Sequence, residues 1–302
     1  MSTDRFAEVN GLRICYRETG PAGAPALFLV VGLGMQLVEW PAAMVERLSR
    51  RFRVICMDNR DTGLSARTGQ SYDRLPEGFR WISRHSVAAP YHIPDMARDL
   101  LGLADHLGIG RFAVAGFSMG GMIAQATAIL APGRVTALAS LSSCAGEPVV
   151  AGTAENDEMI ERFFLPAPSR AALLEAYCES SAFYSGGSAP ADAPQTRAGA
   201  EALIARMEAG GGDQGGYLRQ AFAITDTPAW EAELRQLDVP ALVLHGTEDP
   251  CLPVACGQRA AELVPGAELR LHDGLGHWIS EGIADDLCSW LETLPATAPV
   301  PA

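Results

Sequence analysis

The sequence predicts an α/β fold with a mostly parallel sheet flanked by helices, and three observations predict it. Short apolar runs without polar–apolar alternation, typical of strands buried on both faces, recur along the chain. Segments with helical spacing of apolar residues separate these runs. Residues 146–230 break this rhythm, because their apolar residues recur only at helical spacing. We therefore expect a core domain of residues 1–145 and 231–302, and a helical cap of residues 146–230 inserted after the sixth strand.

The first part of the chain supplies the first six predicted strands. Residues 6–18 predict a hairpin at the sheet edge, because Asn10 and Gly11 in their middle are the preferred residues of a tight turn. Residues 93–108 predict a helix, since their apolar side chains recur at helical spacing between acidic ones. Four further buried strands are predicted at residues 26–31, 52–57, 111–115 and 135–141.

The second part contains the predicted cap and the last strands. Residues 171–180 and 198–209 predict cap helices. The glycine-rich stretches 185–190 and 210–216 are interpreted either as hinges and mobile loops or as simple joints between helices. The last two strands are predicted at residues 241–244 and 267–271.

Composition excludes several classes of partner. The net charge is −13 and no cluster of basic residues occurs, so binding to nucleic acid or to anionic membranes is not expected. The first residues lack a secretory signal and no apolar run is long enough to cross a membrane, which predicts a cytoplasmic protein, as a monomer or homodimer. The cysteines are seven, an odd number, and Cys15, Cys56 and Cys144 have apolar surroundings, which favours reduced thiols over disulfides.

Ser118 is the first candidate catalytic residue. It lies in Gly116-Phe117-Ser118-Met119-Gly120, a G-x-S-x-G sequence between a predicted strand and a predicted helix. Such a sequence builds a sharp turn that exposes the serine at a helix N-terminus, where free N–H groups favour a developing negative charge. The alternative is that Ser118 is only a small residue at a tight turn.

Asp249 and His277 are its candidate partners. Each lies on a loop directly after a predicted strand, and the order Ser118, Asp249, His277 is typical of one large class of hydrolases. Asp249 is predicted to be the acid and His277 the base. Glu248 and Asp273 are the rival acids, with Glu248 expected to point away and Asp273 to be solvated. His245 and His272 are expected to be hydrogen-bonded residues of the fold.

These motifs resemble those of α/β-hydrolase fold serine hydrolases, and the similarity extends over nearly the whole chain. Residues 30–41 and 58–65 are similar to the aclacinomycin methylesterase group, whose members remove a methyl ester from a large polyketide. The resemblance implies an eight-stranded sheet and an oxyanion hole formed by the backbone N–H groups of Leu33 and Met119. The chain departs from many relatives in having Val31 before Gly32, where they have histidine.

The substrate pocket is expected to be apolar. Gly32, Met35, Trp40 and Trp278 are adjacent to the expected catalytic loops in sequence, although the large apolar ones are nearly as typical of ordinary core. A second insertion is expected to overhang this pocket. It spans residues 69–90 and carries Tyr72, Phe79, Trp81 and His85.

The resemblance implies hydrolysis of carboxylic esters, including lactones, of a bulky hydrophobic small molecule through an acyl-enzyme on Ser118. Cleavage of a carbon–carbon bond or a thioester, perhydrolysis, and a small-molecule receptor that keeps the fold remain alternatives. Epoxide hydrolases and haloalkane dehalogenases of this fold are disfavoured, because they have aspartate at the position of Ser118. No cofactor or metal is expected, since the chain has neither an H-E-x-x-H sequence nor a complete nucleotide-binding glycine motif.

Overall fold

The computed structural model describes residues 3–69, 71–79, 81, 85–145 and 152–294. Within them, eight strands form one sheet in the order β1-β2-β4-β3-β5-β6-β7-β8. Strand β2 pairs antiparallel with both of its neighbours, β1 and β4, and the other pairs are parallel. The predicted fold class is thus confirmed. The strands are β1 (Arg5–Val9), β2 (Leu12–Thr19), β3 (Ala26–Val30), β4 (Arg53–Met57), β5 (Phe112–Phe117), β6 (Val135–Leu141), β7 (Ala241–Gly246) and β8 (Glu268–His272).

The hairpin forms where the sequence predicts it. Asn10 and Gly11 have φ angles of 51° and 77°, and Val9 pairs with Leu12 across the turn. Both central residues of such a turn need positive φ, which asparagine and glycine tolerate better than other residues. The hairpin forms one edge of the sheet.

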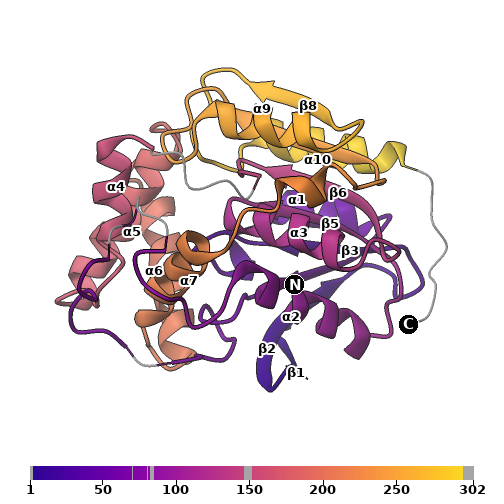
Figure 1. Ribbon diagram of the computed structural model, residues 1–302. Helices are drawn as coiled ribbons and strands as arrows, with labels where there is room; N and C mark the ends of the chain where they lie inside the picture. The colour runs from indigo at the N-terminus through magenta and orange to yellow at the C-terminus, as the bar shows by residue number, and fades with distance from the viewer. Residues whose placement is uncertain (1–2, 70, 80, 82–84, 146–151, 295–302) are drawn as a thin grey trace.

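Helices cover both faces of the sheet (Figure 1). Strand β3 shows why its apolar run does not alternate with polar residues. Phe28 and Val30 pack in the cluster that contains α2, α3 and α9, whereas Leu27 and Leu29 pack in the cluster that contains α1 and α10. All four side chains are fully buried. These covering helices are α1 (Ala42–Ser49), α2 (Ile93–His106), α3 (Met119–Leu130), α9 (Val254–Leu263) and α10 (Glu281–Thr293).

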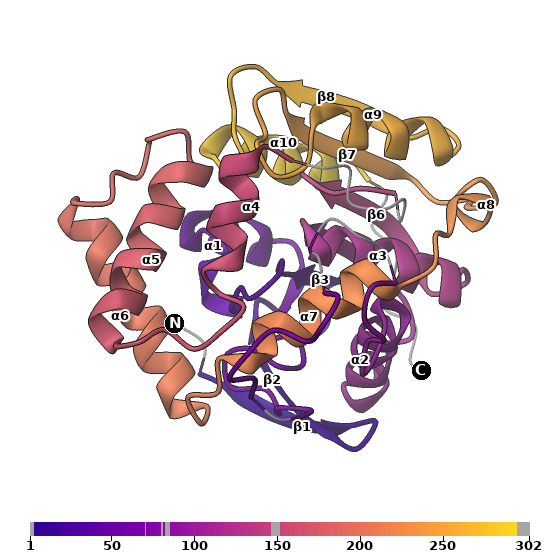
Figure 2. The same ribbon diagram turned by 60° about the vertical axis from the view of Figure 1, so that its left-hand side comes forward.

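Four helices between β6 and β7 lie together beside the sheet, and we call them the cap helices (Figures 1 and 2). The helices predicted at residues 171–180 and 198–209 fall within two of them. The first residues of the predicted cap, 146–151, lie outside the described residues. The cap helices are α4 (Ala154–Glu161), α5 (Arg170–Tyr184), α6 (Pro194–Ala209) and α7 (Gly215–Asp226), and the short helices η1 (Leu37–Glu39) and α8 (Glu231–Leu234) lie elsewhere.

The glycine-rich stretch 210–216 joins α6 to α7, which is one of its two predicted roles, and its last two glycines belong to the second helix. Gly215 and Gly216 are buried and begin α7. A Cβ on Gly216 would stand 2.0 Å from the backbone oxygen of Asp61. Glycine is therefore needed at this position for close packing of α7 on the core.

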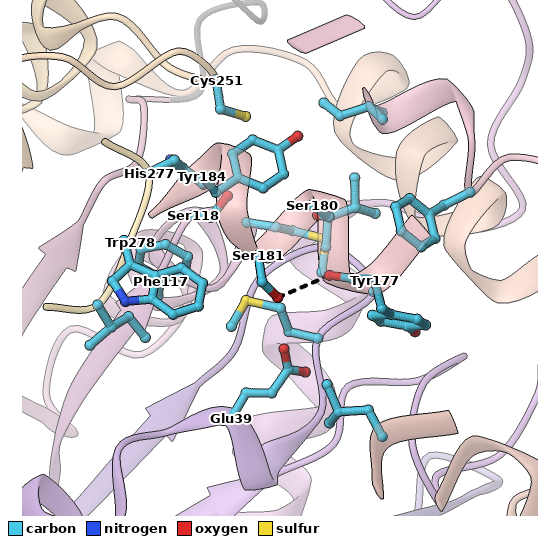
Figure 3. Close-up of a pocket in the computed structure, with 18 of the residues that line it drawn as sticks. Glu39, Phe117, Ser118, Tyr177, Ser180, Ser181, Tyr184, Cys251, His277 and Trp278 are labelled. Carbon is cyan, nitrogen blue, oxygen red and sulfur yellow. Dashed lines mark hydrogen bonds between the residues drawn. The ribbon is translucent and has the colours of Figure 1, made fainter. Parts of the chain in front are cut away.

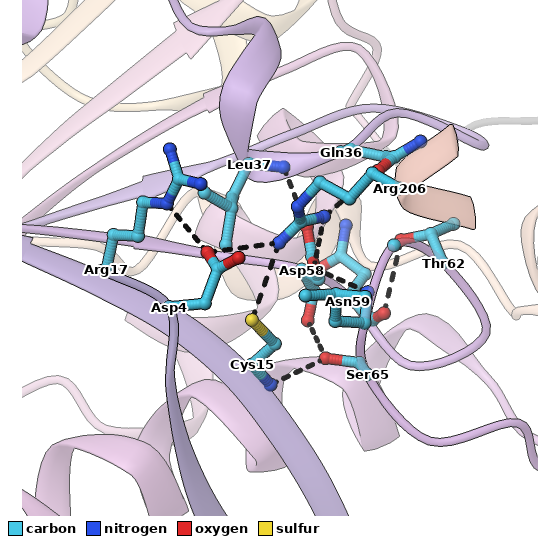
Figure 4. A network of polar contacts seen from close by, with 12 residues as sticks. Asp4, Cys15, Arg17, Gln36, Leu37, Asp58, Asn59, Thr62, Ser65 and Arg206 are labelled. Atoms are coloured by element: carbon cyan, nitrogen blue, oxygen red, sulfur yellow. Dashed lines mark hydrogen bonds and ion pairs between the residues drawn. The ribbon is translucent and has the colours of Figure 1, made fainter. Parts of the chain in front are cut away.

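Two arginines, Arg219 fully buried and Arg206 largely buried, join the cap helices to the turn that follows β4. Arg206 of α6 lies 2.7 Å from Asp58 and also donates to Gln36 Oε1 at 3.0 Å (Figure 4). Arg219 of α7 lies 2.8 Å from Asp61. Asp58 accepts two further hydrogen bonds from backbone N–H groups, so its carboxylate is fully engaged. These contacts hold the cap helices in place above the carboxyl edge of the sheet.

Replacing Arg219 by methionine is expected to lower the free energy of unfolding by about 3–5 kcal/mol, because a buried aspartate then loses its counter-charge. Denaturant-induced unfolding measures this loss. Arg170→Met is the matched control, since Arg170 and Glu208 form an ion pair whose side chains are about half exposed. The control is expected to cost less than about 1 kcal/mol. Equal losses in the two variants would contradict the role given to Arg219.

Candidate active site

Ser118 lies in the sharp turn between β5 and α3. Its φ and ψ are 55° and −124°, a strained combination for a residue with a side chain. The two flanking glycines permit this turn. A Cβ on Gly116 would stand 2.0 Å from the backbone oxygen of Gly120, and one on Gly120 would stand 2.1 Å from that of Val30. The predicted turn is therefore present, with the serine at its apex.

Hydrogen bonds fix the backbone of Ser118. Its N–H donates to the carbonyl oxygen of Leu141 at 2.9 Å, and its own carbonyl accepts from Ser143 Oγ at 2.7 Å. The side chain faces the large pocket at the carboxyl edge of the sheet. A strained residue held in this way is typical of functional sites.

Asp249 and His277 form a shielded pair, as their sequence positions predict. His277 Nδ1 lies 2.7 Å from Asp249 Oδ2, and the two residues are 8% and 7% exposed. The other carboxylate oxygen, Oδ1, accepts from the N–H groups of Cys251 and Leu252. Burial alone raises the pKa of Asp249, but His277, His245 and the hydrogen bond from Leu252 outweigh it and hold the pKa below its usual value. The carboxylate therefore stays charged beside the imidazole.

His277 and Ser118 line the same pocket and lie beside each other (Figure 3). The imidazole is packed between two aromatic rings, with centroids 4.8 Å away for Phe117 and 5.8 Å away for Tyr184. Because Nδ1 is engaged by Asp249, the other ring nitrogen, Nε2, is the one left for the pocket. The structure thus brings together the three residues that the sequence singled out.

The rival residues occupy other environments. Glu248 and Asp273 are exposed, and Asp273 accepts a hydrogen bond from Thr247. His245 Nε2 lies 2.8 Å from the backbone oxygen of Leu252, and burial lowers the pKa of this histidine. His272 lies 3.0 Å from Asp286. None of the four residues lines the pocket with Ser118.

Two backbone N–H groups are available beside Ser118. Met119 begins α3, and the first N–H groups of a helix have no partner within it. In the loop after β3, the Gly34 N–H donates to Gln220 Oε1 at 2.9 Å and the Met35 N–H donates to Gly32. The Leu33 N–H has no such partner among the described residues, and Leu33 lines the pocket. This is the arrangement expected of the predicted oxyanion hole.

Gln220 connects this loop to the cap helices. Its side chain is fully buried, and its Nε2 donates to the backbone oxygen of Arg60 at 2.7 Å while its Oε1 accepts from Gly34. The amide of Gln220 therefore fixes the loop that carries Leu33. No sequence pattern pointed to this residue, because it lies 186 positions from its partner Gly34.

The pocket has a volume of about 650 Å³ and a mainly apolar lining. Met35 and Trp278 line it, as predicted, and so does Trp81 from the insertion 69–90. Gly32 and Trp40 are not among the lining residues. Gly32 lies behind Ser118, where a Cβ would stand 3.0 Å from the serine Cβ, and Trp40 packs in the core cluster of α1 and α10.

Several lining residues come from segments whose position the sequence did not define. They include Glu39 from η1 and a group of hydroxyl-bearing residues from α5, namely Tyr177, Ser180, Ser181 and Tyr184 (Figure 3). Helical spacing predicts that α5 exists, but it does not say which of its faces meets the core. This polar part of the lining was missed for that reason.

All seven cysteines lie within the described residues and none is paired in a disulfide, as the sequence predicted. Cys251 lines the pocket, and its burial raises the pKa of the thiol well above the usual value. It is therefore a protonated, weakly reactive group. In the described part of the chain, no helix combines the length and apolar character needed to cross a bilayer.

A parallel sheet with a strained serine after β5, and with a paired aspartate and histidine after β7 and β8, defines a class of hydrolases. Residues 25–282 match the model of the alpha/beta hydrolase fold family. The chain belongs to this family, and it is a hydrolase.

Individual relatives agree with this assignment. Rhodomycin D methylesterase DauP from Streptomyces sp. (strain C5) is 28% identical, over 89% of this chain and 90% of that protein. A non-heme haloperoxidase from Rhodococcus erythropolis is 27% identical, over 94% and 97%. The crystal structure of the enol-lactonase from Burkholderia xenovorans LB400 is 25% identical, with a TM-score of 0.71 over 95% and 98% of the two chains. The predicted resemblance to α/β-hydrolases, and to methylesterases within that family, is confirmed.

Proposed function

We propose that this hydrolase cleaves carboxylic esters, including lactones, through an acyl-enzyme on Ser118. The observation that carries the proposal is the shielded Asp249–His277 pair in the pocket that also exposes the strained serine. His277 Nε2 removes the Ser118 proton as Oγ attacks the ester carbonyl, and Asp249 stabilises the resulting imidazolium. The alkoxide leaves with that proton. Water, deprotonated by the same histidine, then releases the acid and restores Ser118.

The negative charge of the tetrahedral intermediate is placed on the oxygen that faces Leu33 and Met119. Their N–H groups donate to this oxygen in the proposed mechanism, each contributing about 2.7–4 kcal/mol to the transition state. Gln220 supports the first donor, because it holds the next residue of the loop. The helix dipole of α3 adds to the second.

We also propose that residues 146–230 act as a cap over this pocket, with residues 1–145 and 231–302 as the core. Lining residues contributed by α4, α5, α6 and α7 support this division. The buried pairs of Arg206 and Arg219 support a cap that is held closed rather than freely hinged.

The size and apolar lining of the pocket favour bulky hydrophobic esters. We expect kcat/KM for p-nitrophenyl esters to rise at least about tenfold from acetyl to octanoyl, since each buried methylene contributes about 0.8 kcal/mol. Steady-state hydrolysis across this series measures the rise. Equal values of kcat/KM across the series would contradict a bulky substrate, and a single burst without turnover would instead favour a receptor.

Perhydrolysis is a second candidate, favoured by the similarity to a protein named a haloperoxidase. In that reaction hydrogen peroxide takes the place of water at the acyl-enzyme and a peracid leaves. Product analysis in the presence of peroxide separates the two reactions. Cleavage of a carbon–carbon bond or of a thioester would use the same three residues.

A further inference from the structure

We propose that Glu39 binds a protonated amine on the substrate, in the same pocket as Ser118 but in a different part of it. The inference rests on the proposed function, because it defines which esters the site selects. It makes Glu39 a specificity-determining residue with no part in the bond-breaking steps. The carboxylate points into the cavity, and in the view of Figure 3 Glu39 and His277 lie at opposite ends of the drawn lining.

One oxygen of Glu39 is held and the other is available. Oε2 accepts the backbone N–H of Gln36 at 2.5 Å, and the Gln36 side chain caps the Glu39 N–H in return. Among the described residues, no donor from the protein contacts Oε1. The carboxylate is therefore fixed in direction with one acceptor free for a ligand.

The charges around Glu39 favour a cation. It is the one carboxylate among the described lining residues, and no lysine or arginine lines the pocket with it. Arg206 lies behind it, but that guanidinium is already bound to Asp58 and Gln36 (Figure 4). Glu39 is partly buried, and a carboxylate that has lost part of its water without gaining a counter-ion gains most from a ligand that brings one.

The ionisation of Glu39 supports the same conclusion. Burial raises its pKa to about 7, the charge of Asp58 adds to this rise, and Arg206 opposes it. The group is therefore poised to ionise near neutral pH. A bound ammonium stabilises the charged form, so binding of an amine strengthens as the pH rises through this value.

Hydroxyl groups lie on the same part of the lining. Tyr177, Ser180 and Ser181 come from α5, and Ser181 donates its hydroxyl to the Tyr177 backbone oxygen at 2.9 Å. An ammonium has three N–H donors, and Glu39 does not accept all of them. Hydroxyl oxygens next to the carboxylate are suitable acceptors for the remaining donors. This polar part contrasts with the apolar lining around Ser118.

A purely structural role for Glu39 is the alternative, since glutamate is common at the third position of a capping box. Glu39→Gln separates the two roles, because glutamine caps the turn equally well but carries no charge. The variant is expected to keep the melting temperature of the wild type. A loss of amine binding then reports the charge and not the turn.

Calorimetric titration with an alkylammonium ion of about eight carbons, and with the alcohol of equal length, tests the proposal directly. Wild type near pH 8 is expected to bind the ammonium at least about tenfold more tightly than the alcohol, and Glu39→Gln is expected to lose this preference. Equal binding by wild type, or a preference that survives in Glu39→Gln, would overturn it. The measurement needs no turnover, so failure of the ester mechanism would appear separately, as inactivity toward every ester.

The pH dependence provides a second measurement if Glu39→Gln does not fold. His277 also lines the pocket and is ionisable. The titration therefore uses His277→Ala, in which the imidazole is absent and cannot affect the pH dependence of binding. The groups that then act on Glu39 are Asp58, Arg206 and Tyr177. Preference for the ammonium should rise between about pH 6 and about pH 8 as Glu39 ionises. A preference independent of pH would overturn the proposal.

Discussion

Ser118→Ala is expected to lower kcat for p-nitrophenyl ester hydrolysis by at least about 10⁴-fold, because no acyl-enzyme can then form. Alanine has a Cβ like serine, and it occupies the same strained backbone at a φ of 55°. The fold is therefore expected to be retained. Steady-state kinetics at an enzyme concentration high enough to detect slow turnover measure the loss.

The control for this variant is its stability. Unfolding by denaturant should give a midpoint close to that of the wild type, which shows that a loss of activity is a loss of chemistry. Activity within about tenfold of the wild type would contradict nucleophilic catalysis by Ser118.

Asp249→Asn is expected to lower kcat by about 10⁴-fold. The reason lies in the two N–H groups, from Cys251 and Leu252, that donate to Oδ1. These two donors keep the oxygen of the introduced amide at the position of Oδ1, so the NH₂ group of the amide faces His277 Nδ1. The imidazole then carries its proton on Nε2, where it cannot accept one from Ser118.

Glu248→Gln and Asp273→Asn are matched controls, since both acids are near in sequence and both are exposed. They are expected to keep kcat within about twofold, because surface substitutions away from the site change little. A loss in Asp273→Asn comparable to that in Asp249→Asn would mean that the acid has been assigned to the wrong residue.

Local sequence was sufficient to place the three candidate catalytic residues at one edge of the sheet. Ser118 was predictable because the G-x-S-x-G sequence is specific to this turn. Other backbone segments approach Gly116 and Gly120 so closely that a side chain would not fit at either position. Asp249 and His277 were predictable because parallel strands bring their carboxyl ends to one edge, so loops after distant strands meet there. The hairpin at Asn10 followed from turn chemistry alone.

The lining of the pocket was less predictable, because it depends on tertiary packing. Trp40 is apolar and close in sequence to the loop that carries Leu33, and nothing local distinguishes a core tryptophan from a pocket one. Gly216 looked like part of a joint, although its role is to let α7 approach Asp61. Glu39 lines the pocket and Gln220 contacts Gly34 only because the folded chain brings these segments together.

The measurement that tests the central claim most directly is covalent trapping followed by mass spectrometry. A fluorophosphonate ester places phosphorus where the ester carbonyl would lie, so Ser118 Oγ forms a bond to phosphorus, fluoride leaves, and His277 takes the proton. We predict one label per chain on the peptide that carries Ser118, complete loss of ester hydrolysis on labelling, and no label in Ser118→Ala. Labelling of a different residue, or full activity of a fully labelled enzyme, would contradict the account.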